Sequence, residues 1–315
     1  MIEVKGLTKQ YGSFNAVKDV SFEVGTEQVL GFLGPNGAGK TTVMKILTGY
    51  HFPTAGDAWI DGFSVQEDPV EVKQKIGYLP ENVPLYGDLT VDEYLTFIAQ
   101  ARLISIKERK TAIDQSLESC GLLHNRGKRI ETLSKGYRQR VGLAQAIIHD
   151  PPILILDEPT TGLDPNQIIE IRSLIRELGK RKTVILSTHI LQEVSAICSQ
   201  VLIINEGKIA AQGTPESIAM NLKGRDTWEL ILKGAETSEI AEKLSSLGNI
   251  EPNHLEKNNE GSVNLHFSLS SGEIDGEQIF DWAVKSNLKI LGMNQKKLSL
   301  EDIFVKLTSE NEEKS

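Results

Sequence analysis

The stretch "GPNGAGKTT", residues 34–42, decides the fold. The apolar run "EQVLGFLG", residues 27–34, leads into it and predicts a buried strand that ends in a glycine turn. "KTTVMKILTG", residues 40–49, follows and predicts a helix. A strand, a turn with the spacing G-x-x-x-x-G-K-[ST] and a helix together predict a phosphate-binding loop, whereas a plain glycine-rich turn needs neither flanking element. We therefore expect an α/β chain that binds a nucleotide.

The residues of this loop have distinct tasks. Its glycines let backbone N–H groups turn inward around phosphate oxygens, and the helix N-terminus adds partial positive charge. The Lys40 side chain reaches the β and γ phosphates, and the Thr41 hydroxyl can ligate Mg²⁺. The predicted nucleotide-binding residues are Gly34, Pro35, Asn36, Gly37, Ala38, Gly39, Lys40, Thr41 and Thr42.

The composition excludes several classes of protein. The 315 residues suffice for about two domains, with 39% apolar and 24% charged residues, which is ordinary for a soluble protein. The formal net charge of −9 argues against a general nucleic-acid binder. Cys120 and Cys198 have neither metal nor disulfide spacing, which indicates reduced thiols in the cytosol. No apolar run approaches the ~18 residues that cross a bilayer, so work at a membrane would need a second polypeptide.

Residues 1–219 alternate short apolar runs with helical patterns, which predicts an α/β domain with a mainly parallel sheet. From about residue 83 to residue 150 there is little strand signal, and we expect a helical insertion. Within it Thr90 and Glu93 have the spacing of a capping box. The apolar residues that follow at helical spacing are Leu95, Ile98, Ala99 and Leu103.

Residues 220–315 predict a separate accessory domain. The expected order is strand, helix, strand, strand, helix and strand, at 227–233, 238–247, 250–256, 262–269, 275–286 and 288–294. This βαββαβ order is that of the ferredoxin-like unit. A further helix over 299–308 is expected, with a polar and disordered tail over the last seven residues or so.

Two adjacent carboxylates, Asp157 and Glu158, follow an apolar strand in "ILILDEPTTGLD", residues 153–164. They could simply cap the next helix, but α/β sheets place ligands at the carboxyl ends of their strands, and a phosphate loop is present. His189 ends another strand pattern, "ILSTH". Alone it would be taken for a structural histidine, whereas beside these carboxylates it favours a γ-phosphate contact.

A second anion site is predicted by "LSKGYRQR", residues 133–140. Ser134 precedes a helix, where its hydroxyl can act as an N-cap and can also contact a phosphate. A glycine and three cations lie within the next six residues. One phosphate loop in the chain leaves open which phosphate this second site would hold.

These four motifs, in their order along the chain with "LSKGYRQR" between the phosphate loop and "ILILDEPTTGLD", resemble those of the nucleotide-binding subunit of an ATP-binding cassette (ABC) transporter, over residues 1 to about 215. The resemblance implies a P-loop fold with a RecA-like, mainly parallel sheet, an antiparallel β subdomain and a helical subdomain. It implies an ATPase with ATP and Mg²⁺ as cofactors, and a homodimer whose cassettes pair head to tail, so that one signature closes on the other's ATP. It also implies a separate transmembrane permease, no nucleic acid, and a cytoplasmic place at the inner face of the membrane.

The resemblance assigns catalytic roles to single residues. Glu158 orients or deprotonates the attacking water, and His189 holds the γ-phosphate and that water. Lys40 balances the developing charge. Mg²⁺ is held by Thr41 directly and by Asp157 through water.

The resemblance also assigns binding roles. Tyr11, in "LTKQYGSFNAV", stacks on adenine, with Phe14 as the competing candidate. Asp164 belongs to the dimer-contact loop. The partner-site signature is carried by Ser134, Lys135, Gly136 and Tyr137.

Two of these signature residues depart from the family pattern, because Lys135 replaces a glycine and Tyr137 a glutamine. Ser134 and Gly136 keep the hydroxyl and the close backbone approach. A cation beside a γ-phosphate is electrostatically helpful.

Glu81, in "GYLPENVPLY", replaces a glutamine that in the family contacts Mg²⁺ and water and couples to the permease. A carboxylate cannot donate as an amide can, so its role would shift toward the metal or the permease; a solvated loop Glu is the alternative. This stretch and "LSLEDIFVKLT", residues 298–308, resemble ATPases of ABC-2-type exporters, closest to the gliding-motility-associated group. The rival hypotheses are an importer ATPase, which usually keeps the glutamine, and a soluble ABC ATPase acting on ribosomes or DNA.

Overall fold

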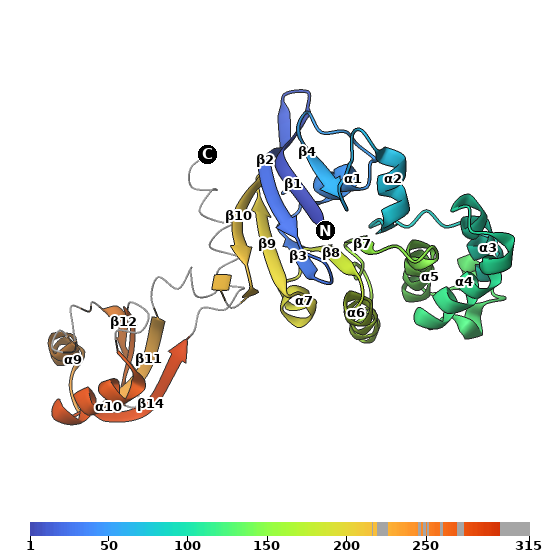
Figure 1. Cartoon of the computed structure of the whole chain (residues 1–315). Helices are drawn as coiled ribbons and strands as arrows, with labels where there is room; N and C mark the ends of the chain where they lie inside the picture. Colours follow the sequence, from blue (N-terminus) through green and yellow to red (C-terminus); the bar gives the residue numbers. More distant parts are fainter. Residues whose placement is uncertain are drawn as a thin grey trace. The chain divides into compact units, whose positions relative to one another are not determined.

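The chain forms two compact units, Met1–Pro215 and Glu216–Ser315, in a computed structural model (Figure 1). The sequence places its domain boundary at 219–220, close to this division. The expected helix over 299–308 and the polar tail lie outside the described residues. The structure describes residues 1–215, 217–218, 226–244, 247, 250, 252–258, 261–269 and 274–296.

A six-stranded sheet, in the order β10-β9-β3-β8-β7-β6, forms the centre of the first unit. Every neighbouring pair is parallel except β10 on β9, which confirms the expected mainly parallel sheet. Its central strands are buried along their whole length, as expected where helices cover both faces. The bounds are β3 Val29–Leu33, β6 Ile76–Leu79, β7 Ile153–Asp157, β8 Thr183–Thr188, β9 Gln200–Asn205 and β10 Lys208–Gly213.

A second, antiparallel sheet has the order β2-β1-β4-β5. Its apolar residues join those of β3, β7, β8 and β9 in one core, which fixes the two sheets to each other. The bounds are β1 Ile2–Tyr11, β2 Phe14–Val24, β4 Ala55–Ile60 and β5 Phe63–Ser64.

The helices of the first unit divide between the central sheet and a helical part. α1 starts directly at the phosphate loop, while α3, α4 and α5 lie together on one side of the sheet (Figure 1). The bounds are α1 Lys40–Leu47, α2 Pro69–Lys75, α3 Val91–Ala101, α4 Ile106–Ser119, α5 Lys135–Ile147, α6 Pro165–Gly179 and α7 Leu191–Ile197, with short 3-10 turns η1 Leu123–Asn125 and η2 Ile130–Thr132.

The start of α3 confirms the capping box. The Thr90 hydroxyl accepts from the Glu93 N–H at 3.2 Å, and the Glu93 carboxylate accepts from the Thr90 N–H at 2.8 Å. The expected apolar stripe is wrong at its end, because Leu103 lies beyond the last residue of α3 and is 86% exposed. Its φ of 58° is left-handed, so the chain has already turned out of the helix there.

The second unit has its own core and sheet. Its described strands pair antiparallel in the order β12-β13-β11-β14, which is the ferredoxin-like arrangement expected from the βαββαβ order. The core includes Trp228, Phe267 and Trp282. The bounds are β11 Asp226–Lys233, α9 Thr237–Leu244, β12 Pro252–Lys257, β13 Val263–Leu269, α10 Gly276–Lys285 and β14 Lys289–Lys296.

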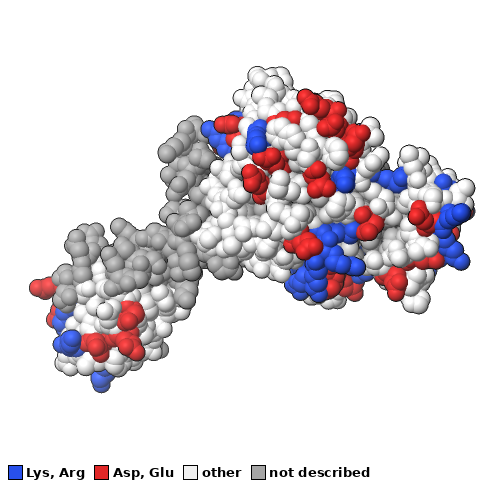
Figure 2. Space-filling view, in the orientation of Figure 1, with Lys and Arg blue, Asp and Glu red and all other residues white. Residues whose placement is uncertain are grey.

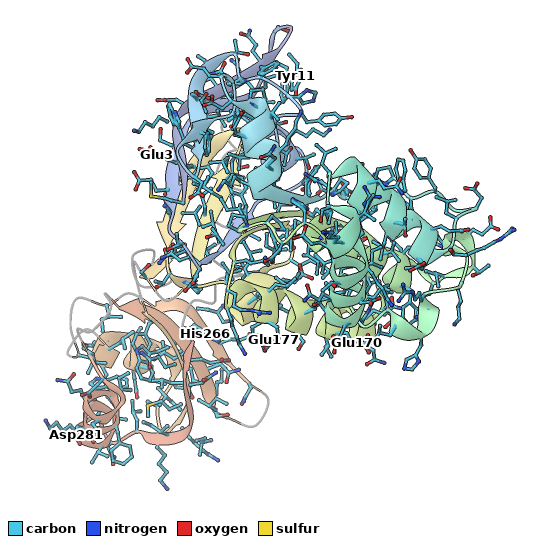
Figure 3. All side chains as sticks on the ribbon, turned by 45° about the vertical axis from the view of Figure 1, so that its right-hand side comes forward. Glu3, Tyr11, Glu170, Glu177, His266 and Asp281 are labelled. Atoms are coloured by element: carbon cyan, nitrogen blue, oxygen red, sulfur yellow. The ribbon has the colours of Figure 1, made fainter. Side chains whose placement is uncertain are left out.

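Charges of both signs occur over the first unit on the face shown in Figure 2. Some link helices to each other, and Arg140 of α5 forms an ion pair with Glu170 of α6. Figure 3 labels Glu170. None of the helices within the described residues combines the length and the apolar character that a bilayer crossing requires.

Candidate nucleotide site

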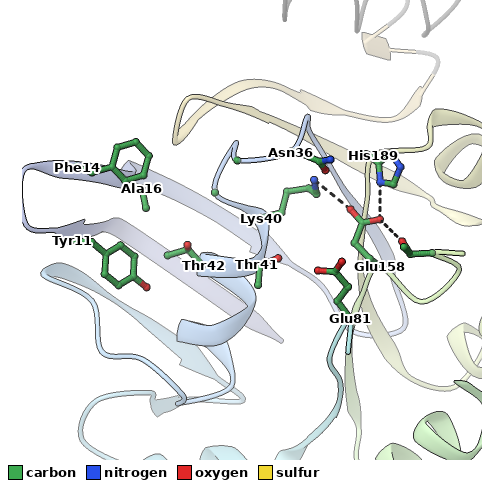
Figure 4. Close-up of a pocket in the computed structure, with 13 residues that line it drawn as sticks. Tyr11, Phe14, Ala16, Asn36, Lys40, Thr41, Thr42, Glu81, Glu158 and His189 are labelled. Carbon is green, nitrogen blue, oxygen red and sulfur yellow. Dashed lines mark hydrogen bonds and ion pairs between the residues drawn. The ribbon is translucent and has the colours of Figure 1, made fainter. Parts of the chain in front are cut away.

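A cavity of about 510 Å³ opens at the carboxyl ends of the central strands, beside the phosphate loop (Figure 4). It brings together residues from five separate parts of the sequence. The lining residues are Tyr11, Phe14, Ala16, Asn36, Gly37, Gly39, Lys40, Thr41, Thr42, Glu81, Glu158, Thr161 and His189.

Lys40 is held by the phosphate loop itself. Its ammonium donates to the carbonyl oxygens of Gly34, at 2.8 Å, and of Pro35, at 3.2 Å. It also lies 3.4 Å from a Glu158 oxygen, and both side chains are about nine-tenths buried or more. Gly39 has a φ of 110°, and a Cβ there would lie 2.5 Å from the Ala16 carbonyl, so only glycine fits the turn into α1.

The Glu158 carboxylate is the centre of the polar cluster (Figure 4). Its Oε2 lies 2.8 Å from His189 Nδ1 and accepts from the Thr161 hydroxyl at 3.2 Å. The backbone at Glu158 is left-handed, with a φ of 48°, and its N–H donates to Ser187. These bonds hold a strained residue with its carboxylate facing the cavity.

Asp157 lies behind Glu158, at the end of β7, and is almost fully buried. Its Oδ1 accepts from the hydroxyls of Ser187 and Thr41, the latter at 3.4 Å. Its Oδ2 is buried and has no hydrogen-bond partner among the described residues. Burial raises the pKa of this carboxyl, an effect that a bound cation would oppose.

Two aromatic rings stand at the far end of the cavity. Tyr11 ends β1 and Phe14 begins β2, so both candidates for the adenine contact line the same wall (Figure 4). The Tyr11 ring lies edge-on to the His51 ring at a centroid distance of 6.1 Å, with the Lys9 ammonium 5.2 Å from its centre. Phe14 is 62% exposed, against 43% for Tyr11.

The signature residues do not line the cavity of their own chain. The Ser134 hydroxyl accepts from the Tyr137 N–H at 3.4 Å and so caps α5, as predicted from the sequence. The Lys135 ammonium lies against Gly162, in the space that a β-carbon there would occupy. A β-carbon at Gly136 would lie 2.5–2.9 Å from the Gln167 amide, so a larger residue there would have to displace this side chain.

Of the two remaining predicted site residues, Glu81 lines the nucleotide cavity and Asp164 does not. Asp164 caps α6 by accepting from the Gln167 N–H at 3.0 Å and lies outside the cavity lining. Glu81 lines the cavity and also lines a second groove of about 280 Å³ that runs toward the helical part.

Sequence reasoning missed Thr161, which contacts Glu158, and Ser187, which contacts both Asp157 and the Glu158 backbone. Both stand inside the quoted motifs, "ILILDEPTTGLD" and "ILSTH". Thr161 follows Glu158 by three residues and Ser187 precedes His189 by two, so hydroxyl residues close to the motifs' reactive side chains are the signal that could have identified them.

Comparison with known proteins agrees with this geometry. The model of the family described as "ABC transporter" matches residues 17–161. The bacitracin transport ATP-binding protein BcrA of Bacillus licheniformis is 35% identical over 311 residues, 98% of this chain and 97% of the relative. The linearmycin resistance ATP-binding protein LnrL of Bacillus subtilis (strain 168) is 29% identical over 313 residues, 98% of each chain.

Among solved structures, the dimeric post-hydrolysis state of the ATP-binding cassette MJ0796, bound to ADP and Pi, is similar with a TM-score of 0.62 and 25% identity. The similarity covers 68% of this chain and 98% of that one. The phosphate loop, the paired carboxylates, the signature helix and full-length similarity to transporter ATP-binding proteins therefore identify the family. The chain belongs to the ATP-binding proteins of ABC transporters, which hydrolyse ATP for transport.

Proposed function

We propose that this chain is the ATP-hydrolysing subunit of an ABC exporter, with Glu158 orienting or deprotonating the attacking water. His189 holds the γ-phosphate and that water, and Lys40 balances the charge that develops on the phosphate. The observation that carries the proposal is one carboxylate in contact with both His189 Nδ1, at 2.8 Å, and Lys40 Nζ, at 3.4 Å. A carboxylate between an imidazole and the phosphate-loop lysine can align a water with a γ-phosphate.

The oxygen donors beside the phosphate loop fit Mg²⁺. Asp157 Oδ2 is a buried acceptor without a partner within the described part of the chain, and the Thr41 hydroxyl contacts the same carboxylate. Thr41 would hold the ion directly, Asp157 through water, and Glu81 is a third oxygen donor in the cavity. The described residues contain no cluster of three or more metal-binding side chains, so phosphate oxygens and waters must complete the shell. The bound ion would neutralise charge on the β and γ phosphates.

A homodimer would complete the nucleotide site. The signature residues at the start of α5, from Ser134 to Tyr137, lie away from their own chain's cavity lining, and the solved cassette MJ0796 is dimeric. Head-to-tail pairing would bring the Ser134 hydroxyl and the positive end of α5 to the partner's γ-phosphate. The Lys135 ammonium adds a cation that a glycine signature lacks, and the Asp164 loop would contact the partner.

Export through a separate ABC-2-type permease is supported by similarity over nearly the whole chain to proteins named for bacitracin transport and linearmycin resistance. The place of action is then the cytoplasmic face of the membrane. A narrower membership, in the gliding-motility-associated group, rests only on the sequence around Glu81 and over residues 298–308.

The test is Glu158→Gln, which keeps the side-chain size and removes its charge and basicity. We expect turnover to fall by ~100-fold or more, the usual contribution of a general base. MgATP should bind at least as tightly as to the parent chain, because a negative charge beside the γ-phosphate is gone. Sedimentation velocity with MgATP should then show a stable dimer.

Glu177→Gln is the matched control, because this exposed carboxylate on α6 pairs only with Lys180 within the described residues (Figure 3). It should leave turnover within about twofold, since exposed pairs contribute little. The proposal fails if Glu158→Gln stays monomeric with MgATP, or if it hydrolyses ATP near the parental rate.

A further inference from the structure

One fully buried carboxylate lies just behind the polar cluster and outside the nucleotide cavity. Glu193, in the first turn of α7, has an exposed fraction of 0%. Its Oε1 accepts from the Thr160 hydroxyl at 2.5 Å, and its Oε2 accepts from the Thr188 hydroxyl at 2.7 Å. The Arg172 guanidinium of α6 lies 3.5 Å from Oε1. Hydroxyls and a cation therefore surround a charge that burial would otherwise disfavour.

The two threonines belong to the segments that carry the reactive pair. Thr160 stands two residues after Glu158, and Thr188 directly precedes His189. The Thr188 hydroxyl also accepts from the Ile190 N–H at 3.0 Å, so it fixes the backbone on both sides of His189. One carboxylate at the start of α7 thus hydrogen-bonds both to the segment after Glu158 and to the end of β8.

The position of Glu193 in the first turn of α7 does not by itself explain why its carboxylate is buried. Acidic residues favour the first turn of a helix, because the helix dipole is positive there. That preference is satisfied at the surface as well, whereas the Glu193 carboxylate points inward and is divided between two different loops. Burying a carboxylate costs free energy unless it is paired and hydrogen-bonded. The bonds of Glu193 to the segments that carry Glu158 and His189 therefore explain its burial better than the helix dipole does.

We propose that Glu193 is a positioning residue for hydrolysis: it sets Glu158 and His189 relative to each other without contacting nucleotide. The segment from Thr160 runs on through Gly162 to Asp164, the expected dimer-contact loop. A partner that presses on this segment would therefore shift the His189 loop through the same carboxylate. This inference rests on the roles proposed above for Glu158 and His189.

The main test is Glu193→Gln, which keeps the volume of the side chain but replaces one acceptor oxygen with a donor. We expect kcat to fall at least tenfold, while the Kd for MgATP changes less than threefold, because the phosphate loop is untouched. Glu193→Asp should recover part of the loss, since it keeps the charge. A merely structural role would lower the melting temperature and leave kcat per folded molecule unchanged.

Two isosteric variants examine the bonds to Glu193. Thr160→Val removes the Oε1 bond, whereas Thr188→Val removes the Oε2 bond together with the bond from the Ile190 N–H. Thr160→Val and Thr188→Val should each lower kcat at least threefold. Thr160→Val should add little further loss when combined with Glu193→Gln, because both act through one carboxylate. Ser195→Ala is the control on the same helix, where the hydroxyl contacts only the Leu191 carbonyl within the described residues. It should leave kcat unchanged.

Folded Glu193→Gln with a kcat within twofold of the parent would overturn the inference. If that variant does not fold, Thr188→Val decides, and a parental kcat there overturns it. Glu158→Gln and His189→Ala are measured in parallel. If they keep their turnover, the proposed function itself is wrong; if they lose it while Glu193→Gln does not, only the positioning role is wrong.

Discussion

The Lys40 ammonium already has protein contacts at the place where a γ-phosphate would bind it. The Lys40 ammonium is shared between two loop carbonyls and the Glu158 carboxylate, and the Lys40 and Glu158 side chains are both buried. A γ-phosphate that binds this ammonium must displace part of them. The carboxylate then needs its second partner, His189, to stay in place, which the 2.8 Å contact provides.

Tyr11 and Phe14 give a prediction at the same scale. Tyr11→Ala should weaken ATP binding by roughly 5- to 150-fold, because base stacking on an aromatic ring contributes about 1–3 kcal/mol. Tyr11→Phe should bind normally. Phe14→Ala should have a smaller effect, because contacts with His51 and Lys9 already orient Tyr11, while Phe14 is the more exposed ring. Fluorescent-nucleotide titration would decide, and a larger loss for Phe14→Ala would reverse the assignment.

Helix α5 and strand β6 join the signature to the rest of the cassette. The two approach so closely that a β-carbon at Gly77 would lie 2.1 Å from the Ala146 carbonyl. A β-carbon at Gly142 would meet Val83 at 2.7 Å. The helix that begins with the signature therefore packs directly on the strand that leads to Glu81.

His149, just beyond α5, should make stability depend on pH. Its Nε2 lies 3.1 Å from the Ile76 carbonyl of β6, and burial, with Arg102 and Lys182 nearby, lowers its pKa to about 4. Because the unfolded histidine titrates near 6.5, the unfolded chain binds more protons between these values. Stability is therefore fully present above about pH 6.5 and is lost as pH falls toward 4.

The measurement is urea unfolding at pH 7 and pH 5. The parent should lose roughly 1–2 kcal/mol over this interval beyond the loss in His149→Gln, which can still donate to the carbonyl and does not titrate. Equal losses in both chains would show that His149 does not contribute.

In the segment that follows β6, Glu81 is the residue that we predict to couple ATP hydrolysis to the permease. Since it lines both the nucleotide cavity and the neighbouring groove, we expect Glu81→Ala to reduce permease-stimulated ATPase activity much more than basal activity. Both rates are measured with and without the permease in lipid. If the two rates fall by the same factor, Glu81 serves the metal or the water and not the coupling.

The two units of the whole molecule have separate cores. Among the described residues, all those that line the nucleotide cavity belong to the first unit, while the second unit packs its own tryptophans and leucines between its sheet and helices. The acidic balance of residues 220–315, net −6, would repel ATP. The second unit is thus suited to a task other than nucleotide binding.

A chain that ends at Lys223 tests this division. It should bind ATP with an affinity close to that of the full chain, because the cavity is intact, but dimerise more weakly if the second unit supports the dimer. Nucleotide titration and light scattering on the same sample separate the two effects. Loss of ATP affinity would show that the boundary is misplaced.

The local chemistry of the site could be predicted from sequence because it depends on neighbours along the chain. The glycine spacing of residues 34–42, the Thr90–Glu93 capping box and the Ser134 N-cap each involve residues a few positions apart, where backbone geometry fixes the contact. Alternating patterns also sufficed for the order of strands and helices in the second unit, whereas the antiparallel sheet of the first unit was expected only from the family resemblance. The exception was Leu103, where periodicity alone did not show that the helix had ended.

Only the tertiary structure decided which distant side chains touch. Thr160 and Glu193 are 33 positions apart, and they meet because Thr160 follows β7 while Glu193 lies in the helix after β8, the parallel neighbour of β7. The nearness of Glu158 and His189 was expected from the strand pattern, but their 2.8 Å contact was not. Sequence spacing carries no information on the register of β7 and β8 or on the direction in which a buried carboxylate points. The contact of Lys135 with Gly162 could not be predicted either, since it depends on how α5 packs beside the loop that follows β7.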